Sequence, residues 1–330
     1  MSDSASAAPG PPARRQTVFY LIALLLPLAA FAVLEGALRL FGFAEPEPLF
    51  VEAPQPGWLE PNADVIDRFF ASPAAAPDTQ IDTTLFRRER PEGGLRLVVQ
   101  GGSTAAGFPF GKWASLAGSL QQRLSRERPG RPVEVISTAM SAVNSYTLWD
   151  FGKEIIALQP DAVLIYAGHN EYLGILGVGS TWATRLSPEA TRRLLRARDF
   201  RLLALANRAW AAVTGGTEGQ RQGTLMSRVA RERRIPYASP LYEAGLAQFR
   251  SNMSALLSDY RAAGIPVYLG LIAANERDQP PLLGFPDNEA DVPARIGRVD
   301  ALIQSGSLEE AEAVAREWVA AIPDDPEAYY

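Results

Sequence analysis

Four short apolar runs alternate with segments of helical periodicity along the middle of the chain. The runs are LRLVVQG at 95–101, VEVIST at 133–138, DAVLIYAG at 161–168 and PVYLGLIA at 266–273. They show little alternation between apolar and polar positions, which is typical of strands buried on both faces. Between the first two, KWASLAGSLQQRLSRER carries an apolar stripe at helical spacing. This alternation of strands and helices predicts an α/β domain, with a parallel sheet between two layers of helices.

The N-terminal region has a different pattern, in which a small, Pro-rich polar tail leads into a long apolar run. Residues 17–34, TVFYLIALLLPLAAFAVL, contain no charge, and a run of this length predicts a helix that spans a bilayer. Arg14 and Arg15 precede the run and acidic residues follow it. By the positive-inside rule, the N-terminus is then cytoplasmic and the domain extracytoplasmic, or periplasmic.

We therefore expect a disordered cytoplasmic tail at 1–15 and a single-pass transmembrane anchor at 16–43. Two alternatives remain open. A cleavable signal peptide is one, because Ala30-Phe31-Ala32 has the small-x-small form of a cleavage site. A buried core helix is the other, and it alone would leave the domain unexported.

Composition divides the rest of the chain into parts. Residues 44–90 are rich in Pro and Ala and predict a linker or arm, and the α/β domain follows at 91–290. Within that domain, residues 185–234 contain twelve arginines against four acids. This segment is either a solvated helical insertion or a surface that faces anionic lipid or an anionic polymer.

The C-terminal segment, 291–330, contains two amphipathic helices joined at SGS. Trp318, Ala321 and Pro326 stand at offsets that resemble a tetratricopeptide repeat, and such a repeat implies a protein partner. One repeat cannot bury its own faces, since arrays generally need about three units. We therefore expect an incomplete repeat at 291–330 and a chain that is cut short.

Charge and residue counts exclude several classes of function. The net charge of −5 gives no sign of nucleic-acid binding. Without cysteine there is no thiolate zinc site and no cysteine nucleophile, and a single histidine leaves only scattered carboxylates as metal ligands. Neither a Gly-x-Gly-x-x-Gly loop nor a Walker lysine motif occurs. We expect neither a cofactor nor a metal.

Small and polar residues follow three of the predicted strands. GGSTAAG at 101–107 would expose the hydroxyl of Ser103 where a helix begins, although such a turn can also cradle a phosphate. AMSAVNS at 139–145 allows a close backbone approach, and GHNE at 168–171 brings the side-chain amide of Asn170. Together they predict a serine nucleophile with an oxyanion hole at one edge of the sheet.

The order of these blocks over residues 95–175 resembles the SGNH, or GDSL-like, hydrolase family. The resemblance implies a flavodoxin-like three-layer α/β/α fold. It also implies that Ser103 is the nucleophile, with its own N–H as one oxyanion donor and the Asn170 amide as another. The glycine of the second block falls on Ala142, with Ala139 as the alternative. LIAANERDQPP, after the fourth run, resembles membrane-anchored family members that carry tetratricopeptide insertions.

The chain departs from the family pattern at three places. Gly102 replaces the aspartate of Gly-Asp-Ser, an alanine replaces the glycine of the second block, and no Asp-x-x-His occurs. His169, the one histidine, is a weak candidate for the missing general base. Neighbouring residues of an extended chain point to opposite sides, so His169 faces away if Asn170 faces the site. We expect His169 to shape the asparagine loop, and the true base to lie beyond Tyr330.

From these patterns we predict a membrane-anchored serine hydrolase that acts on acyl esters of an envelope glycan or lipid. The alternatives are an O-acetyltransferase with the same site and a non-catalytic anchored adaptor that binds partners through the helical repeat.

Further polar residues stand near strand ends, either as loop caps and ion pairs or as ligands of a polar substrate. They are Glu171, Asn275, Arg277 and Asp278.

Overall fold

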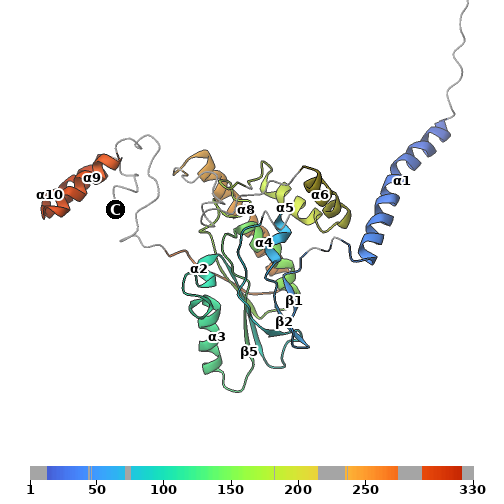
Figure 1. Ribbon diagram of the computed structural model, residues 1–330, viewed down its shortest axis with the longest axis horizontal. Helices are drawn as coiled ribbons and strands as arrows, with labels where there is room; N and C mark the ends of the chain where they lie inside the picture. The colour runs from blue at the N-terminus through green and yellow to red at the C-terminus, as the bar shows by residue number, and fades with distance from the viewer. Residues whose placement is uncertain are drawn as a thin grey trace, which may run out of the picture.

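A four-stranded parallel sheet forms the centre of the fold (Figure 1). The computed structural model describes residues 13–43, 45, 47–70, 76–181, 183–214, 235, 237–273 and 292–321. The strands of the sheet are β4 (Leu95–Gly101), β5 (Val133–Ser137), β6 (Ala162–Tyr166) and β7 (Val267–Leu269). They lie in the order β5-β4-β6-β7, and every pair is parallel. The predicted α/β class and parallel sheet are confirmed.

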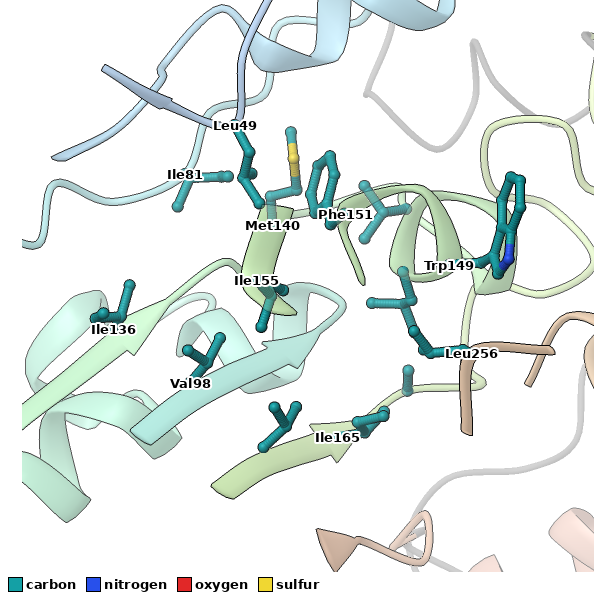
Figure 2. Packing of buried hydrophobic residues seen from close by; sticks show 14 of the residues in the cluster. Leu49, Ile81, Val98, Ile136, Met140, Trp149, Phe151, Ile155, Ile165 and Leu256 are labelled. Carbon is teal, nitrogen blue, oxygen red and sulfur yellow. The ribbon is translucent and has the colours of Figure 1, made fainter. Parts of the chain in front are cut away.

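Helices cover both faces of this sheet. They are α3 (Leu116–Glu127) on one face and α4 (Ser145–Ala157) and α8 (Pro240–Ala262) on the other. Successive residues of β4 explain the two layers, because Val99 packs with Ala117 of α3 whereas Val98 belongs to the larger core that α4 and α8 complete. Figure 2 shows Val98 facing the layer that holds Ile155 and Leu256. β4 is thus buried on both sides, as its apolar run predicted, whereas the same prediction is wrong for β7, in which Tyr268 is 65% and Leu269 48% exposed.

The range predicted as a linker or arm, 44–90, contains a small antiparallel sheet. Its elements are β1 (Phe50–Glu52), β2 (Trp58–Pro61) and β3 (Phe86–Arg87), with a 3₁₀ turn at Val65–Phe69. Leu49 and Phe86 are fully buried and belong to the main core. Figure 2 shows Leu49 and Ile81 close to Met140. This arm therefore closes one side of the core instead of standing apart from it.

The Arg-rich insertion contributes two helices to the described residues. They are α5 (Pro188–Ala197) and α6 (Arg201–Thr214), and α6 contacts α1 (Ala13–Leu40). Within α1, Val18–Leu40 has a mean hydropathy of 2.3 and only 6% of its most apolar window is buried. This helix is long and apolar enough to cross a membrane, and an uncleaved anchor and a signal sequence share that property.

The remaining elements are short or C-terminal. They are α2 (Ser103–Ala106), a 3₁₀ turn at Lys112–Ala114, α9 (Val292–Gln304) and α10 (Leu308–Ala321). The last two helices pack together as a hairpin, in which Trp318 is 6% exposed and the Arg295 guanidinium lies 5.6 Å from the centre of its ring. The hairpin supplies two helices at the predicted place, and its assignment as a tetratricopeptide unit stays a prediction.

A buried arginine connects the arm to the central sheet. The side chain of Arg96 is 2% exposed, and its Nε and Nη2 atoms each lie 2.8 Å from Oε2 of Glu134 in β5. Nη2 also donates to the carbonyl of Arg87 in β3 at 2.6 Å, and Nη1 to the carbonyl of Leu158 at the end of α4 at 3.4 Å. The Arg96 guanidinium thus links the central sheet, the sheet of the arm and the end of α4. Its four hydrogen-bonding contacts offset the free-energy cost of burying the charge.

Replacing Arg96 by methionine should lower the free energy of unfolding by about 3–5 kcal/mol. The Glu134 carboxylate, whose side chain is only 11% exposed, would then stay charged without its cationic partner. Urea unfolding followed by tryptophan fluorescence measures the loss. The matched control is Arg90→Met, which breaks a 2.6 Å pair with Asp161 whose side chains are 41% and 31% exposed. A surface pair contributes about 0–1 kcal/mol. Equal losses in the two variants would contradict the structural role of Arg96.

Candidate functional site

The candidate site lies at the carboxyl edge of the central sheet. β4 is hydrogen bonded to β5 on one side and to β6 on the other. The chain therefore leaves β4 toward one neighbour and later returns to the opposite neighbour, and ligands of open parallel sheets bind beyond the carboxyl ends of strands at such a change of direction. The three loops that follow β4, β5 and β6 are the ones that contain the predicted serine, alanine and asparagine.

Ser103 lies where β4 turns into α2. The turn is tight at Gly101, because a Cβ atom there would lie 2.3 Å from the carbonyl oxygen of Tyr166 and 2.4 Å from Cβ of Ala105. Ser103 is the first residue of α2 and is half-buried. Its N–H belongs to the first turn of a helix and has no intrahelical acceptor. Among the described residues, no group is hydrogen bonded to Oγ of Ser103.

Asn170 reaches the serine turn from the loop after β6. The residue is 7% exposed. Its Nδ2 atom lies 3.0 Å from the position that a Cβ atom would take on Gly102. A Cβ atom at position 102 would lie close to this amide, so the glycine leaves room for Asn170. The structure thus brings the asparagine amide against the residue that precedes the serine.

Ala142, in the loop after β5, has a left-handed backbone with a φ of 62° and is 1% exposed. A non-glycine residue in this region costs about 1–2 kcal/mol, and such strain is often found at functional sites. Its carbonyl accepts from the N–H of Ile175 at 2.9 Å, and its own N–H has no partner within the described ranges. By contrast, the N–H of Ala139 donates to Ser137 Oγ at 3.4 Å. Ala142 is therefore the alanine with a free donor.

Backbone hydrogen bonds hold the three loops together. The N–H of Met140 donates to the carbonyl of Gly101 at 3.2 Å, which joins the second loop to the end of β4. Gly174 donates to the carbonyl of Asn170 at 2.6 Å, and a Cβ atom on Gly174 would lie 2.8 Å from the carbonyl oxygen of Ala142. The loops of Asn170 and Ala142 therefore meet at Gly174, a position that has no room for a side chain.

His169 is exposed, while its neighbour Asn170 is buried. The imidazole packs against the ring of Tyr166, with centroids 5.5 Å apart and planes tilted by 59°. No hydrogen bond between His169 and the serine occurs in the part of the chain that the structure describes. Both residues lie in a turn that the hydrogen bond from the Glu171 N–H to the carbonyl of Gly168 closes at 3.1 Å, so the extended chain assumed in the sequence analysis is not the cause of their opposite exposure. The other polar residues singled out near this edge, Asn275, Arg277 and Asp278, lie outside the described residues.

Glu171 has a role that its sequence context did not reveal. The residue is 4% exposed, and its carboxylate accepts from the N–H and the hydroxyl of Ser145 at 3.1 and 2.7 Å and from Nε2 of Gln248 at 2.6 Å. Asn252 Nδ2 donates in turn to Ser145 Oγ at 2.9 Å. The carboxylate thus caps the N-terminus of α4 and ties the asparagine loop to α8. Spacing gave no signal for this role, because the donors are 26 and 77 residues away.

Burial raises the pKa of the Glu171 carboxyl, and the hydrogen bonds from Gln248 and Ser145 oppose that rise. The described residues include no group of three or more His, Asp or Glu side chains that could hold a metal ion. The described loops at this edge of the sheet contain the Ser103 hydroxyl, the backbone N–H groups of Ser103 and Ala142, and the Asn170 amide.

A raised pKa makes the folded protein bind its Glu171 proton more tightly than the unfolded chain does. The free energy of unfolding, relative to that of Glu171→Gln, should therefore fall as the pH rises above the ordinary value of 4.5 and level off above the folded pKa. Urea unfolding between about pH 4 and about pH 8 measures the difference.

The matched control is Glu189→Gln. A hydrogen bond from Ser251 lowers the pKa of Glu189, so the stability relative to this variant should instead be lost as the pH falls through that lowered pKa. Profiles of the same sign for the two variants would contradict the assignment of Glu171.

Comparisons with known proteins give matches only among solved structures. No protein-family model matches the chain, and no curated protein does. AlinE4, an SGNH-hydrolase family esterase, is 15% identical with a TM-score of 0.29, over 64% of this chain and 96% of that one. The esterase EstA from Pseudoalteromonas sp. is 12% identical with a TM-score of 0.26, over 53% and 76%. A GDSL-like lipase from Bacteroides thetaiotaomicron is 17% identical with a TM-score of 0.25, over 55% and 70%. The chain is thus similar to SGNH and GDSL esterases and lipases at TM-scores below 0.5, a level that establishes no family.

Proposed function

We propose that the chain is the SGNH-type ester hydrolase part of a membrane-anchored protein, with Ser103 as the nucleophile. The observation that carries the proposal is the meeting of three loops at one edge of the sheet. There the Asn170 amide lies against Gly102, and the N–H of Ala142 has no partner among the described residues. A hydroxyl beside several free N–H donors is the arrangement that acyl transfer requires.

In the proposed reaction, Ser103 Oγ attacks the carbonyl carbon of an ester, and the carbonyl electron pair moves to oxygen. The N–H groups of Ser103 and Ala142 and the Asn170 amide donate to this oxyanion. Its collapse expels the alcohol, and water then hydrolyses the acyl-enzyme. The donors are held before the substrate arrives, so little reorganisation is needed when the charge develops.

The reaction also needs a base for the Ser103 proton, and the described residues place none on that hydroxyl. His169 is exposed against Tyr166. Because the 330 residues contain no other histidine, a histidine base of the usual kind would have to come from elsewhere. For the 330-residue chain we infer slow ester turnover.

The substrate class follows from the surroundings of the site. Phe108, whose N–H donates to the carbonyl of Ser103 at 3.0 Å, is 71% exposed, and Phe110 is 81% exposed. These exposed rings, which follow the serine closely in the chain, support a substrate with an apolar acyl chain. We further propose that α1 is an uncleaved anchor with the domain outside the cytoplasm, so that the ester belongs to an envelope glycan or lipid.

With 1-naphthyl acetate, the 330-residue chain should turn over near the rate of Ser103→Ala, because loss of a triad base costs on the order of 10⁴ to 10⁶ in kcat. After the rate of imidazole without protein is subtracted, added imidazole should raise the rate of the unmodified chain and of the control Ser125→Ala, but not that of Ser103→Ala. An equal rise in all three would refute the serine. Robust turnover without imidazole, lost in both Ser103→Ala and His169→Ala, would make His169 the base.

Asn170→Ala should lower the imidazole-dependent kcat by about 10²–10³, since one oxyanion donor is removed. The neighbouring control, His169→Ala, leaves the donor set intact and should stay within about tenfold of the unmodified chain. Circular dichroism checks that both variants fold. If the two substitutions cost the same, Asn170 does not stabilise the oxyanion.

A further inference from the structure

An acidic residue near the end of the apolar helix α1 caps another helix. Glu35 is 7% exposed, and its carboxylate accepts from the backbone N–H groups of Arg201 and Leu202 at 3.1 and 3.0 Å. Nε of Arg39, one turn later, donates to the same carboxylate at 2.7 Å. Two N–H groups of the first turn of α6 thereby find an acceptor, and the charge of Glu35 is neutralised. The end of α1 and the start of α6 form one hydrogen-bonded unit, which we call the α1–α6 clamp.

The clamp fixes the position of the start of α6 along the axis of α1, close to the end of its apolar part. The charge-free run 17–34 is about 27 Å long as a helix, at about 1.5 Å per residue, against a hydrocarbon layer of about 30 Å. Phe31 lies within that run, and its ring centre is 5.8 Å from that of Phe200, immediately before α6. If α1 crosses a bilayer, Phe200 lies at the depth of the acyl chains or at their boundary.

Apolar side chains near the clamp are left uncovered. Phe200 is 43% exposed and Leu203 41%, and the sequence of α6 begins RLLALA. Exposed apolar side chains that gather in one region mark an interaction surface. The surface continues onto α1, whose exposed residues include Val33 and Leu34 at 70% and 52%. An occupant that covers α1 therefore also reaches α6.

We infer that α6 lies along the outer boundary of the same bilayer that α1 crosses, with Phe200 and Leu203 among the acyl chains. The inference rests on the proposed anchor and adds a second membrane contact, made by a helix inserted between β6 and β7. With two points of contact joined by the clamp, the catalytic domain has a defined orientation on the membrane surface. The arginine-rich character of the insertion suits the adjacent headgroup layer, where guanidinium groups meet phosphates.

The chain contains no cysteine, so single cysteines can be labelled specifically with the dye NBD. Leu203→Cys reports on α6, Leu25→Cys on the middle of α1, and Arg123→Cys on α3, where the native side chain is 80% exposed. The labelled full chain is reconstituted in vesicles of phosphatidylcholine and phosphatidylglycerol, with and without spin-labelled phosphatidylcholine. The dye at 203 should be quenched by the lipid-borne spin label, as at 25, and protected from aqueous iodide. The dye at 123 should behave in the opposite way.

Three outcomes would overturn the inference, and they are distinguishable. Quenching at 203 by iodide but at 25 by lipid would keep the anchor and remove α6 from the bilayer. Absence of lipid quenching at both positions would remove the anchor itself. Protection at 203 from both quenchers would show that protein, such as a second copy of the chain, covers α6. None of these readings depends on ester hydrolysis, so the proposed chemistry is judged separately.

The clamp is tested by adding Glu35→Ala to the chain labelled at 203. Loss of the acceptor should reduce the lipid quenching at 203 toward the value at 123, while the value at 25 stays unchanged. Glu45→Ala is the matched control, because Glu45 pairs with the side chain of Arg201 at 3.2 Å but is 69% exposed. Equal effects of the two substitutions would overturn the role of the clamp.

Discussion

The pairing of β4 with two parallel neighbours is the constraint on which the rest of the structure depends. β4 exchanges hydrogen bonds with β5 and β6 along its length, and its side chains alternate between the core toward α3 and the core toward α4 and α8. Parallel strands end at the same edge, so three loops far apart in sequence must meet there. The candidate site is a consequence of that geometry.

Close contacts between the backbones of these loops then fix the geometry of the candidate site. Gly101 and Gly174 stand where a Cβ atom would collide with neighbouring backbone, and Ala142 keeps a left-handed conformation that its side chain disfavours. Beneath them, the carboxylate of Glu171 ties the asparagine loop to α4 and α8. Burial of the Glu171 carboxylate and the left-handed backbone of Ala142 each cost free energy of folding. Both hold the loop that contains Asn170 in one position.

Two parts of the chain outside the sheet complete the domain in different ways. The arm contributes apolar side chains such as Leu49 and Phe86 to the main core, and Arg96 joins it to β4. The helix α1 instead exposes its apolar surface and contacts the domain through Glu35 and Phe31. The apolar side chains of the arm are thus buried in the core, whereas those of α1 are exposed, and the last turns of α1 mark the change between the two segments.

The sequence by itself predicted the α/β class of the fold, which the structure confirms, and a candidate site at the carboxyl ends of the strands. Non-alternating apolar runs require strands buried on both sides, and the residues that follow such strands must lie at one edge, so Ser103 and Asn170 could be named from local pattern. The count of one histidine in the 330 residues likewise led to the prediction that the proposed nucleophile has no histidine base within them. Only the tertiary structure decided that the arm enters the core, that Glu171 caps α4, that Ala142 adopts a positive φ and that Glu35 caps α6. Each of these rests on contacts between residues far apart in the chain, for example 166 and 167 positions for Glu35. Periodicity records which face of an element is buried but carries no information about which distant group covers it.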